Sequence, residues 1–239
     1  MTAAGMVATP LAARRGPVRR ALSSVVIGGL AVTTGLGAAQ RWGPRRAFVA
    51  LATIAPATAV VEKVGTTTGR PFGAYRYTSV LRPQIADVPA IVPLAWFAMS
   101  LPARETAHAA LGRRSSVGGR ILLGSFALAA WDLFLDPQMV GEGYWQWARR
   151  GRYRGIPLSN FVGWFLTGLA VMALLELANP PIGGADGSLV GEYAFVAVME
   201  TVGFAAFFAD RTTAIAGAAG MLPVAGLAVG QLLRSDGRG

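Results

Sequence analysis

The sequence has no cysteine and only one histidine, His108. Disulfide bonds and thiolate chemistry are therefore excluded, and a single imidazole cannot form the usual kind of histidine metal site. Charge is also scarce, since 14% of the 239 residues are charged while 53% are hydrophobic, and the mean hydropathy is +0.47. An ordinary soluble domain does not have this composition, so we expect the bilayer to be the solvent.

Acidic residues are fewer than basic ones, with 12 Asp and Glu against 22 Lys and Arg. The basic excess lies in short clusters between apolar runs. This pattern is typical of loops that flank transmembrane helices, and it favours a membrane over nucleic acid as the partner.

Long apolar stretches recur along the whole chain, and a helix needs about 20 mostly apolar residues to cross a hydrocarbon core of about 30 Å. Seven stretches qualify to different degrees: 21–40, 46–64, 86–104, 119–136, 157–178, 190–209 and 212–233. We predict an all-α, polytopic membrane helix bundle with about seven transmembrane helices. Its single domain spans 19–234, between a disordered basic tail at 1–18 and a short C-terminal tail at 235–239.

The first apolar stretch follows Arg14, Arg15, Arg19 and Arg20, as a signal peptide would. Because six further stretches follow, we interpret it as a retained span. With a cytoplasmic N-terminus, 13 Lys and Arg fall on the cytoplasmic side and nine on the other. The sequence therefore predicts a multi-pass protein of the cell membrane with its N-terminus in the cytoplasm.

Two carboxylates, Asp132 and Asp136, close the fourth apolar stretch. Four residues apart on a helix, they share one face, and Pro137 is expected to mark the helix end. Mutual repulsion and burial favour one retained proton near neutral pH, which is what acid/base catalysis requires. The alternative is that Asp136 caps the helix and pairs with an arginine of residues 149–154.

Other polar side chains also fall at membrane depth, where an ionisable group is costly and usually functional. The order of the spans places six polar residues near one membrane face: Glu62, Asp87, Asp132, Asp136, Asn160 and Asp210. We predict the site there. Glu200, near the middle of the sixth stretch, fits either a proton relay or a hydrogen bond between helices.

Aromatic residues surround these carboxylates in the sequence. Trp131 and Trp164 lie within spans, where an indole face can stabilise a cation or line a channel for a long apolar ligand. Tyr144, Trp145 and Trp147 are more typical of an interfacial belt.

The segment after Glu62 contains Gly65, Gly69, Pro71 and Gly73, which predict a tightly folded loop. It lacks the pattern of a phosphate-binding loop. A loop of this kind beside Glu62 can fold back as a lid over the site.

Four motifs carry a family resemblance: E-x-x-G-x-x-x-G-x-P-F-G-x-Y-x-Y at 62–77, W-D-x-x-L-D-P at 131–137, W-x-W at 145–147 and G-I-P-x-x-N-F-x-G-W-F at 155–165. Together they resemble the carotenoid-biosynthesis integral membrane protein family, which includes the carotenoid 1,2-hydratases. The resemblance covers residues of about 60 to 210.

The resemblance implies a cofactor-independent hydro-lyase of carotenoid (terpenoid) biosynthesis. Such an enzyme adds water across the terminal C1=C2 double bond of an acyclic (ψ) end group and forms a tertiary alcohol. The implied partners are an acyclic C40 or C50 carotenoid, membrane lipid and other carotenoid-biosynthesis enzymes, with no nucleic acid, cofactor or metal.

The resemblance also implies site residues. The positions carried over from the family are Glu62, Gly73, Tyr75, Tyr77, Asp132, Asp136 and Asn160. We predict that the catalytic residues are Asp132, Asp136, Glu62 and Asn160, and that the substrate-binding residues are Trp131, Trp164, Tyr75, Tyr77, Phe72 and Phe161. Hydration needs a buried acid, a base for water and electron-rich walls around a carbocation. Either aspartate can be the acid, and Glu62 or the other aspartate then orients water with Asn160.

Three alternatives use the same features. A carotenoid end-group cyclase begins with the same protonation, but a neighbouring double bond captures the cation. A transporter also has buried carboxylates and kinked spans, although no internal repeat is evident between the two halves. A carotenoid-binding protein would need the apolar channel without the chemistry.

Overall fold

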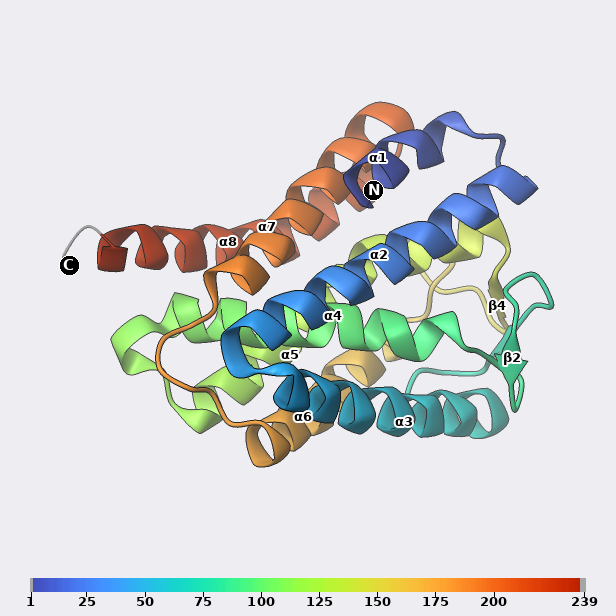
Figure 1. Cartoon of the computed structure of the whole chain (residues 1–239). Coiled ribbons are helices and arrows are strands. Elements are labelled where there is room, and N and C mark those ends of the chain that lie inside the picture. The colour runs from blue at the N-terminus through green and yellow to red at the C-terminus, as the bar shows by residue number, and fades with distance from the viewer. Residues whose placement is uncertain (1, 237–239) are drawn as a thin grey trace.

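The computed structural model describes residues 2–236 and consists of long helices gathered into one bundle (Figure 1). The long helices are α2 Pro17–Trp42, α3 Pro44–Thr68, α4 Ile91–Leu111, α5 Val117–Glu142, α6 Leu158–Ala178, α7 Gly187–Val202 and α8 Arg211–Asp236. Within the described residues, six helices are long and apolar enough to cross a membrane, α7 being extended by the π turn η3 at Gly203–Phe207. The chain is therefore a multi-pass membrane protein, and the predicted all-α bundle is confirmed.

Helix α4 is the seventh long helix and lies at the centre of the bundle, with all of residues 96–107 buried. The expected span at 86–104 is misplaced by several residues at both ends. Val88–Pro89 (β3) instead pairs with Gln84–Ile85 (β2) ahead of the helix. The helix then continues past Arg104 and Glu105, because their side chains neutralise each other at 3.0 Å.

Helix α5 does not end at Pro137, as the sequence analysis expects, but continues to Glu142. A proline inside a helix leaves the carbonyl four residues earlier without its N–H donor. Here that carbonyl belongs to Leu133, and the hydroxyl of Tyr153 donates to it at 2.8 Å. The replacement donor satisfies the freed carbonyl, so the helix passes through the proline.

The N-terminal residues differ from the expected disordered tail. They form α1 (Thr2–Ala8) and the 3-10 turn η1 (Thr9–Leu11), and α1 lies against α2. Arg19 donates to the carbonyls of Pro10 and Ala12 at 2.8 and 3.0 Å and to Glu142 at 2.9 Å. The segment is thereby fastened to the end of α5. The domain boundaries at 19 and 234 stay predictions.

A two-stranded ribbon joins two loops at one end of the bundle. Strand β1 (Tyr75–Tyr77) pairs antiparallel with β4 (Trp145–Trp147), so that Tyr75 lies opposite Trp147 and Tyr77 opposite Trp145. Alternation along a strand places these four aromatic rings on one face of the ribbon. The opposite face carries Arg76, which donates to Gln146 at 3.0 Å.

Candidate active site

Glu62 on α3 is buried at the ribbon end of the bundle and is held by three neutral donors. Its Oε2 accepts hydrogen bonds from the hydroxyls of Tyr75 and Tyr77, the latter at 2.7 Å, and its Oε1 accepts from Trp96 Nε1 at 2.9 Å. Gly65 follows one turn later on the same face, and a Cβ there would lie 3.0 Å from the Tyr75 hydroxyl. Glycine at this position therefore leaves room for the ring that reaches Glu62.

The two tyrosines on the ribbon remain donors at neutral pH. Burial, and then the negative charge of Glu62, raise the pKa of Tyr75 and Tyr77 above the usual value for a phenol. Both hydroxyls therefore keep their protons and orient the carboxylate.

Asp132 and Asp136 lie on one face of α5, as their spacing predicts, and face Asn160 on α6. The Asn160 amide Nδ2 donates to Asp132 Oδ2 at 2.6 Å and to Asp136 Oδ2 at 2.9 Å. Trp145 Nε1 donates to Asp136 Oδ1 at 2.5 Å. The other oxygen of Asp132 is buried and has no hydrogen-bond partner in the part of the chain that the structure describes. The carboxyl pair is thus bridged by one amide.

The alternative that Asp136 caps the helix and pairs with an arginine of 149–154 does not hold. The arginine of that run that forms an ion pair is Arg154, and its partner is Asp210. Across residues 2–236, no Lys or Arg nitrogen lies within 4.0 Å of the carboxyl oxygens of Glu62, Asp132 or Asp136. Neutral groups alone contact these acids, so no countercharge fixes them in the ionised form.

Glu62, Asp136 and Asn160 border a cavity, which we name the carboxylate chamber. Its lining includes Glu62, Phe72, Tyr75, Tyr77, Trp96, Asp136, Trp145, Trp147, Asn160 and Trp164. A few polar groups in a mostly apolar wall fit an apolar ligand that reacts at one point.

Stacked indoles form one wall of the chamber. Trp96 lies on Trp164 with ring centroids 3.9 Å apart and an interplanar angle of 14°, and Trp131 meets Trp164 edge-on at 6.2 Å. The faces of such rings attract a positive charge. The wall can therefore stabilise a carbocation formed beside the carboxyls.

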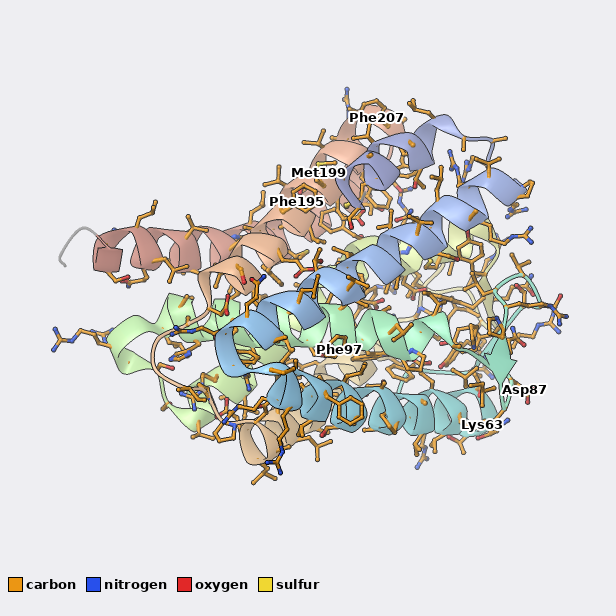
Figure 2. All side chains as sticks on the ribbon, viewed as in Figure 1. Lys63, Asp87, Phe97, Phe195, Met199 and Phe207 are labelled. Atoms are coloured by element: carbon orange, nitrogen blue, oxygen red, sulfur yellow. The ribbon has the colours of Figure 1, made fainter. Side chains whose placement is uncertain are left out.

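Two of the six polar residues expected at the site lie outside the chamber. Asp87 is exposed on the β2–β3 turn and pairs with Lys63 at 3.0 Å, at the outer edge of the bundle (Figure 2). Asp210 caps α8 by accepting a hydrogen bond from the Thr213 backbone at 3.0 Å. The other four, Glu62, Asp132, Asp136 and Asn160, are brought together.

The aromatic residues predicted to bind substrate do not all line the carboxylate chamber. Tyr75, Tyr77, Phe72 and Trp164 line the carboxylate chamber. Trp131 lines an adjoining cavity. The ring of Phe161 lies against Tyr153 at 5.4 Å, outside the chamber lining.

Some residues of the site were misinterpreted or missed in the sequence. Trp145 and Trp147 line the chamber and Tyr144 is 2% exposed, so the interpretation of these residues as an interfacial belt is wrong. The matched spacings Y-x-Y and W-x-W, each with the period of a strand, are the signal that could have indicated their pairing. Trp96, which donates to Glu62, carries no local signal beyond an indole within a span.

No group of three or more His, Cys, Asp or Glu side chains within residues 2–236 is arranged to hold a metal ion. The three carboxyls are arranged instead around Asn160, Trp96 and the ribbon. The groups available at the chamber are thus carboxyl, amide, phenol and indole.

Fold and site together define a multi-pass membrane protein with buried carboxyl groups at an apolar, aromatic chamber. The chain belongs to the carotenoid biosynthesis protein family, whose sequence pattern it matches over residues 21–230. The resemblance found in the sequence motifs is thereby confirmed.

A curated relative, bisanhydrobacterioruberin hydratase of Haloarcula japonica, is 33% identical to the chain over 134 residues. The match covers 55% of this chain and 45% of the relative, so it spans less than half of the relative's length. No solved structure matches the chain.

Proposed function

We propose that the protein is a carotenoid hydratase, which adds water across the terminal C1=C2 double bond of an acyclic C40 or C50 carotenoid. The observation that carries the proposal is a set of three carboxyls without a cationic partner at an apolar, aromatic chamber. The name of the curated relative supports the same reaction type. The cell membrane supplies the lipid in which substrate and product dissolve, and other carotenoid-biosynthesis enzymes are the expected partners.

The first step is protonation of the double bond. Asp132 and Asp136 are buried and share Asn160, so two negative charges there repel each other at high cost and the pair retains one proton. Asp136 borders the chamber and delivers this proton to the less substituted carbon. The electron pair of the double bond forms the new C–H bond and leaves a tertiary carbocation beside Trp96 and Trp164.

The second step is capture of the cation by water. Glu62, oriented by three donors, accepts a proton from the water as its oxygen bonds to the cation. Transfer of that proton back to the aspartate pair restores the resting state. One water is consumed, and no redox change occurs.

Expression in a bacterial host that accumulates an acyclic carotenoid tests the function, with the pigment analysed by liquid chromatography and mass spectrometry. We expect a mass gain of one water per reacted end and an unchanged chromophore. An unchanged mass with a shortened chromophore would indicate the cyclase alternative. An unaltered C40 and C50 pigment would favour the transporter or binding alternatives.

We further propose that the ribbon end faces the cytoplasm, because 13 Lys and Arg lie at that end and eight of the described ones lie at the other. The natural absence of cysteine allows single cysteines to report the side. Gly184→Cys fits the structure at the end opposite the ribbon, because nothing lies within 4 Å of a Cβ there. Ser79→Cys is the matching substitution at the ribbon end, where Ser79 is exposed.

A membrane-impermeant maleimide should label Gly184→Cys in intact cells and Ser79→Cys only after permeabilisation. The reverse pattern would place the N-terminus outside.

A further inference from the structure

A second cavity adjoins the carboxylate chamber, and we name it the α2–α7 chamber. Its walls include Ser24 and Leu30 from α2, Trp131 from α5, and Met199 and Gly203 from α7 and η3. Five side chains line both cavities: Ile27, Leu81, Ile91, Leu135 and Met139. Since the same side chains border both spaces, the two cavities are neighbours that share one wall of apolar side chains.

The α2–α7 chamber reaches the surface of the bundle. Met199 and Gly203 are half-buried on α7 and η3, and the apolar side chains Phe195 and Val198 on α7 are 36% and 51% exposed. Figure 2 shows Met199 between Phe195 and Phe207 along this helix. The shared wall therefore lies between the carboxyl groups and an apolar surface that faces lipid.

Helix α1 covers part of the α2–α7 chamber. Met6 and Thr9 line the cavity from above, and α1 crosses α2 closely, since a Cβ on Gly5 would lie 2.9 Å from Val26 Cγ2. The ion pair between Arg19 and Glu142 fastens this cover to α5. The chamber is thus a roofed groove, not an open surface.

We propose that the α2–α7 chamber holds the polyene chain of an acyclic carotenoid whose end group lies in the carboxylate chamber. The inference rests on the proposed function. Only the end group of a long, linear carotenoid reacts at the carboxyl groups. The rest of the molecule is apolar and therefore needs an apolar space next to the carboxylate chamber. Leu135, Met139 and the other shared side chains line both cavities. The α2–α7 chamber is therefore the apolar space that adjoins the carboxylate chamber.

One consequence concerns carotenoids with two acyclic ends. Both ends cannot lie in a single carboxylate chamber, and the polyene chain points from that chamber through the α2–α7 chamber toward lipid. The two ends therefore react in separate binding events.

The test fills the chamber from two facing helices. Met199→Trp and Ser24→Trp add bulk to opposite walls, and Val198→Trp is the matched control because Val198 is 51% exposed and lies outside the lining. Each full-length protein is purified from a host that accumulates an acyclic carotenoid, and the retained pigment is measured by its visible absorbance per protein. We expect about ten-fold or greater loss of pigment in both filled variants and none in the control.

The pigment measurement is independent of hydration. Asp136→Asn should retain pigment while it loses hydration. A wild-type protein that retains pigment without hydrating it would contradict the proposed function but not the inference. Unchanged pigment in the recovered filled variants would overturn the inference, and two facing positions provide the test even where one variant is not recovered from the membrane.

Discussion

Both ends of the bundle bury acidic side chains, but Glu105 at one end and the three carboxyls beside the chamber at the other end have different partners. At the end opposite the ribbon, Glu105 forms an ion pair with Arg104 at 3.0 Å and accepts a hydrogen bond from the Asp186 backbone at 2.9 Å. Arg104 also donates to the Asn179 carbonyl at 2.6 Å and lies over the ring of Trp42. At the ribbon end, Glu62 and the two aspartates receive hydrogen bonds from phenol, indole and amide groups.

Under the proposed function, this difference separates a structural carboxylate from a reactive one. An arginine partner holds Glu105 in its ionised form, and the pair joins α4 to the segment between α6 and α7. A buried carboxyl with neutral donors can exist with or without its proton, as general acid/base chemistry requires. We infer that the reaction takes place at the ribbon end, where the buried carboxyls beside the chamber lack a cationic partner. Substitutions can alter each end of the bundle separately.

The largest effect is expected at the aspartate pair. Asp136→Asn keeps the shape of the side chain but removes the acidic proton, so we expect hydration to fall by about a hundred- to ten-thousand-fold. Asp132→Asn should also abolish hydration, since Asp136 then has no carboxylate with which to share its proton. Product per membrane-inserted protein is the measurement.

The control for these variants is Asp87→Asn, an exposed acid at the same end of the bundle. It should leave hydration unchanged. Full activity in Asp132→Asn would contradict its assigned part in the pair.

The opposite end should respond in stability instead. Arg104→Met leaves Glu105 buried without its arginine, with the His108 ring 3.9 Å away, and loss of a buried ion-pair partner costs about 3–5 kcal/mol. The unfolding temperature in detergent should fall strongly. Replacing both Arg104 and Glu105 with Met should be milder than the single change, because no isolated charge remains. Equal stability of Arg104→Met and the wild type would contradict the structural role of the ion pair between Arg104 and Glu105.

A smaller effect is expected from one donor to Glu62. A hydrogen bond to a charged group contributes about 1.5–3 kcal/mol, so Tyr77→Phe should lower hydration by about ten- to a hundred-fold. The ring stays packed against Trp145, whose centroid is 5.7 Å away. Tyr153→Phe removes a half-buried hydroxyl outside the chamber and should reduce stability rather than the rate. Equal losses of rate in both variants would argue against a specific part for Tyr77.

The smallest effect is expected at the ion pair of Arg154 and Asp210, near the surface of the ribbon end. Burial raises the pKa of Asp210, but hydrogen bonds from Thr213 and Arg154 and the Arg154 charge outweigh it and lower the pKa below the usual value. A depressed pKa contributes stability above the unfolded value, and this contribution is lost as pH falls through the folded pKa.

Asp210→Asn should therefore destabilise the protein at pH 7 by at most about 1 kcal/mol. The difference from wild type should begin to shrink as pH falls below about 4, the usual value for an aspartate, and should vanish only below the lower folded pKa of Asp210. Thermal unfolding over this pH range measures it, and a difference that grows in acid would show the sign to be wrong.

The sequence is sufficient for the spans and for part of the site. Apolarity alone locates most helices, and helical spacing with alternating span direction brings Asp132, Asp136 and Asn160 to one place. The position of α4 was missed because the mutual neutralisation of Arg104 and Glu105 within a helix is invisible to a count of charges.

The remaining features depend on packing between distant segments. The pairing of β1 with β4 joins residues about 70 positions apart in the chain, and the matched Y-x-Y and W-x-W spacings indicate two strands but do not fix their register. Likewise, Pro137 ends a helix unless another donor reaches Leu133, and that donor comes from Tyr153. The bond from Trp96 to Glu62 exists only because α3 lies beside α4.

The most direct test of the central claim is to incubate the purified protein with an acyclic carotenoid in deuterium oxide that carries a heavy oxygen isotope. Mass spectrometry of the product then follows both atoms of the added water. We expect one carbon-bound deuterium and one heavy oxygen for each reacted end, and neither label with Asp136→Asn. A product without heavy oxygen, or equal labelling by wild type and variant, would contradict hydration by the unpaired carboxyl groups.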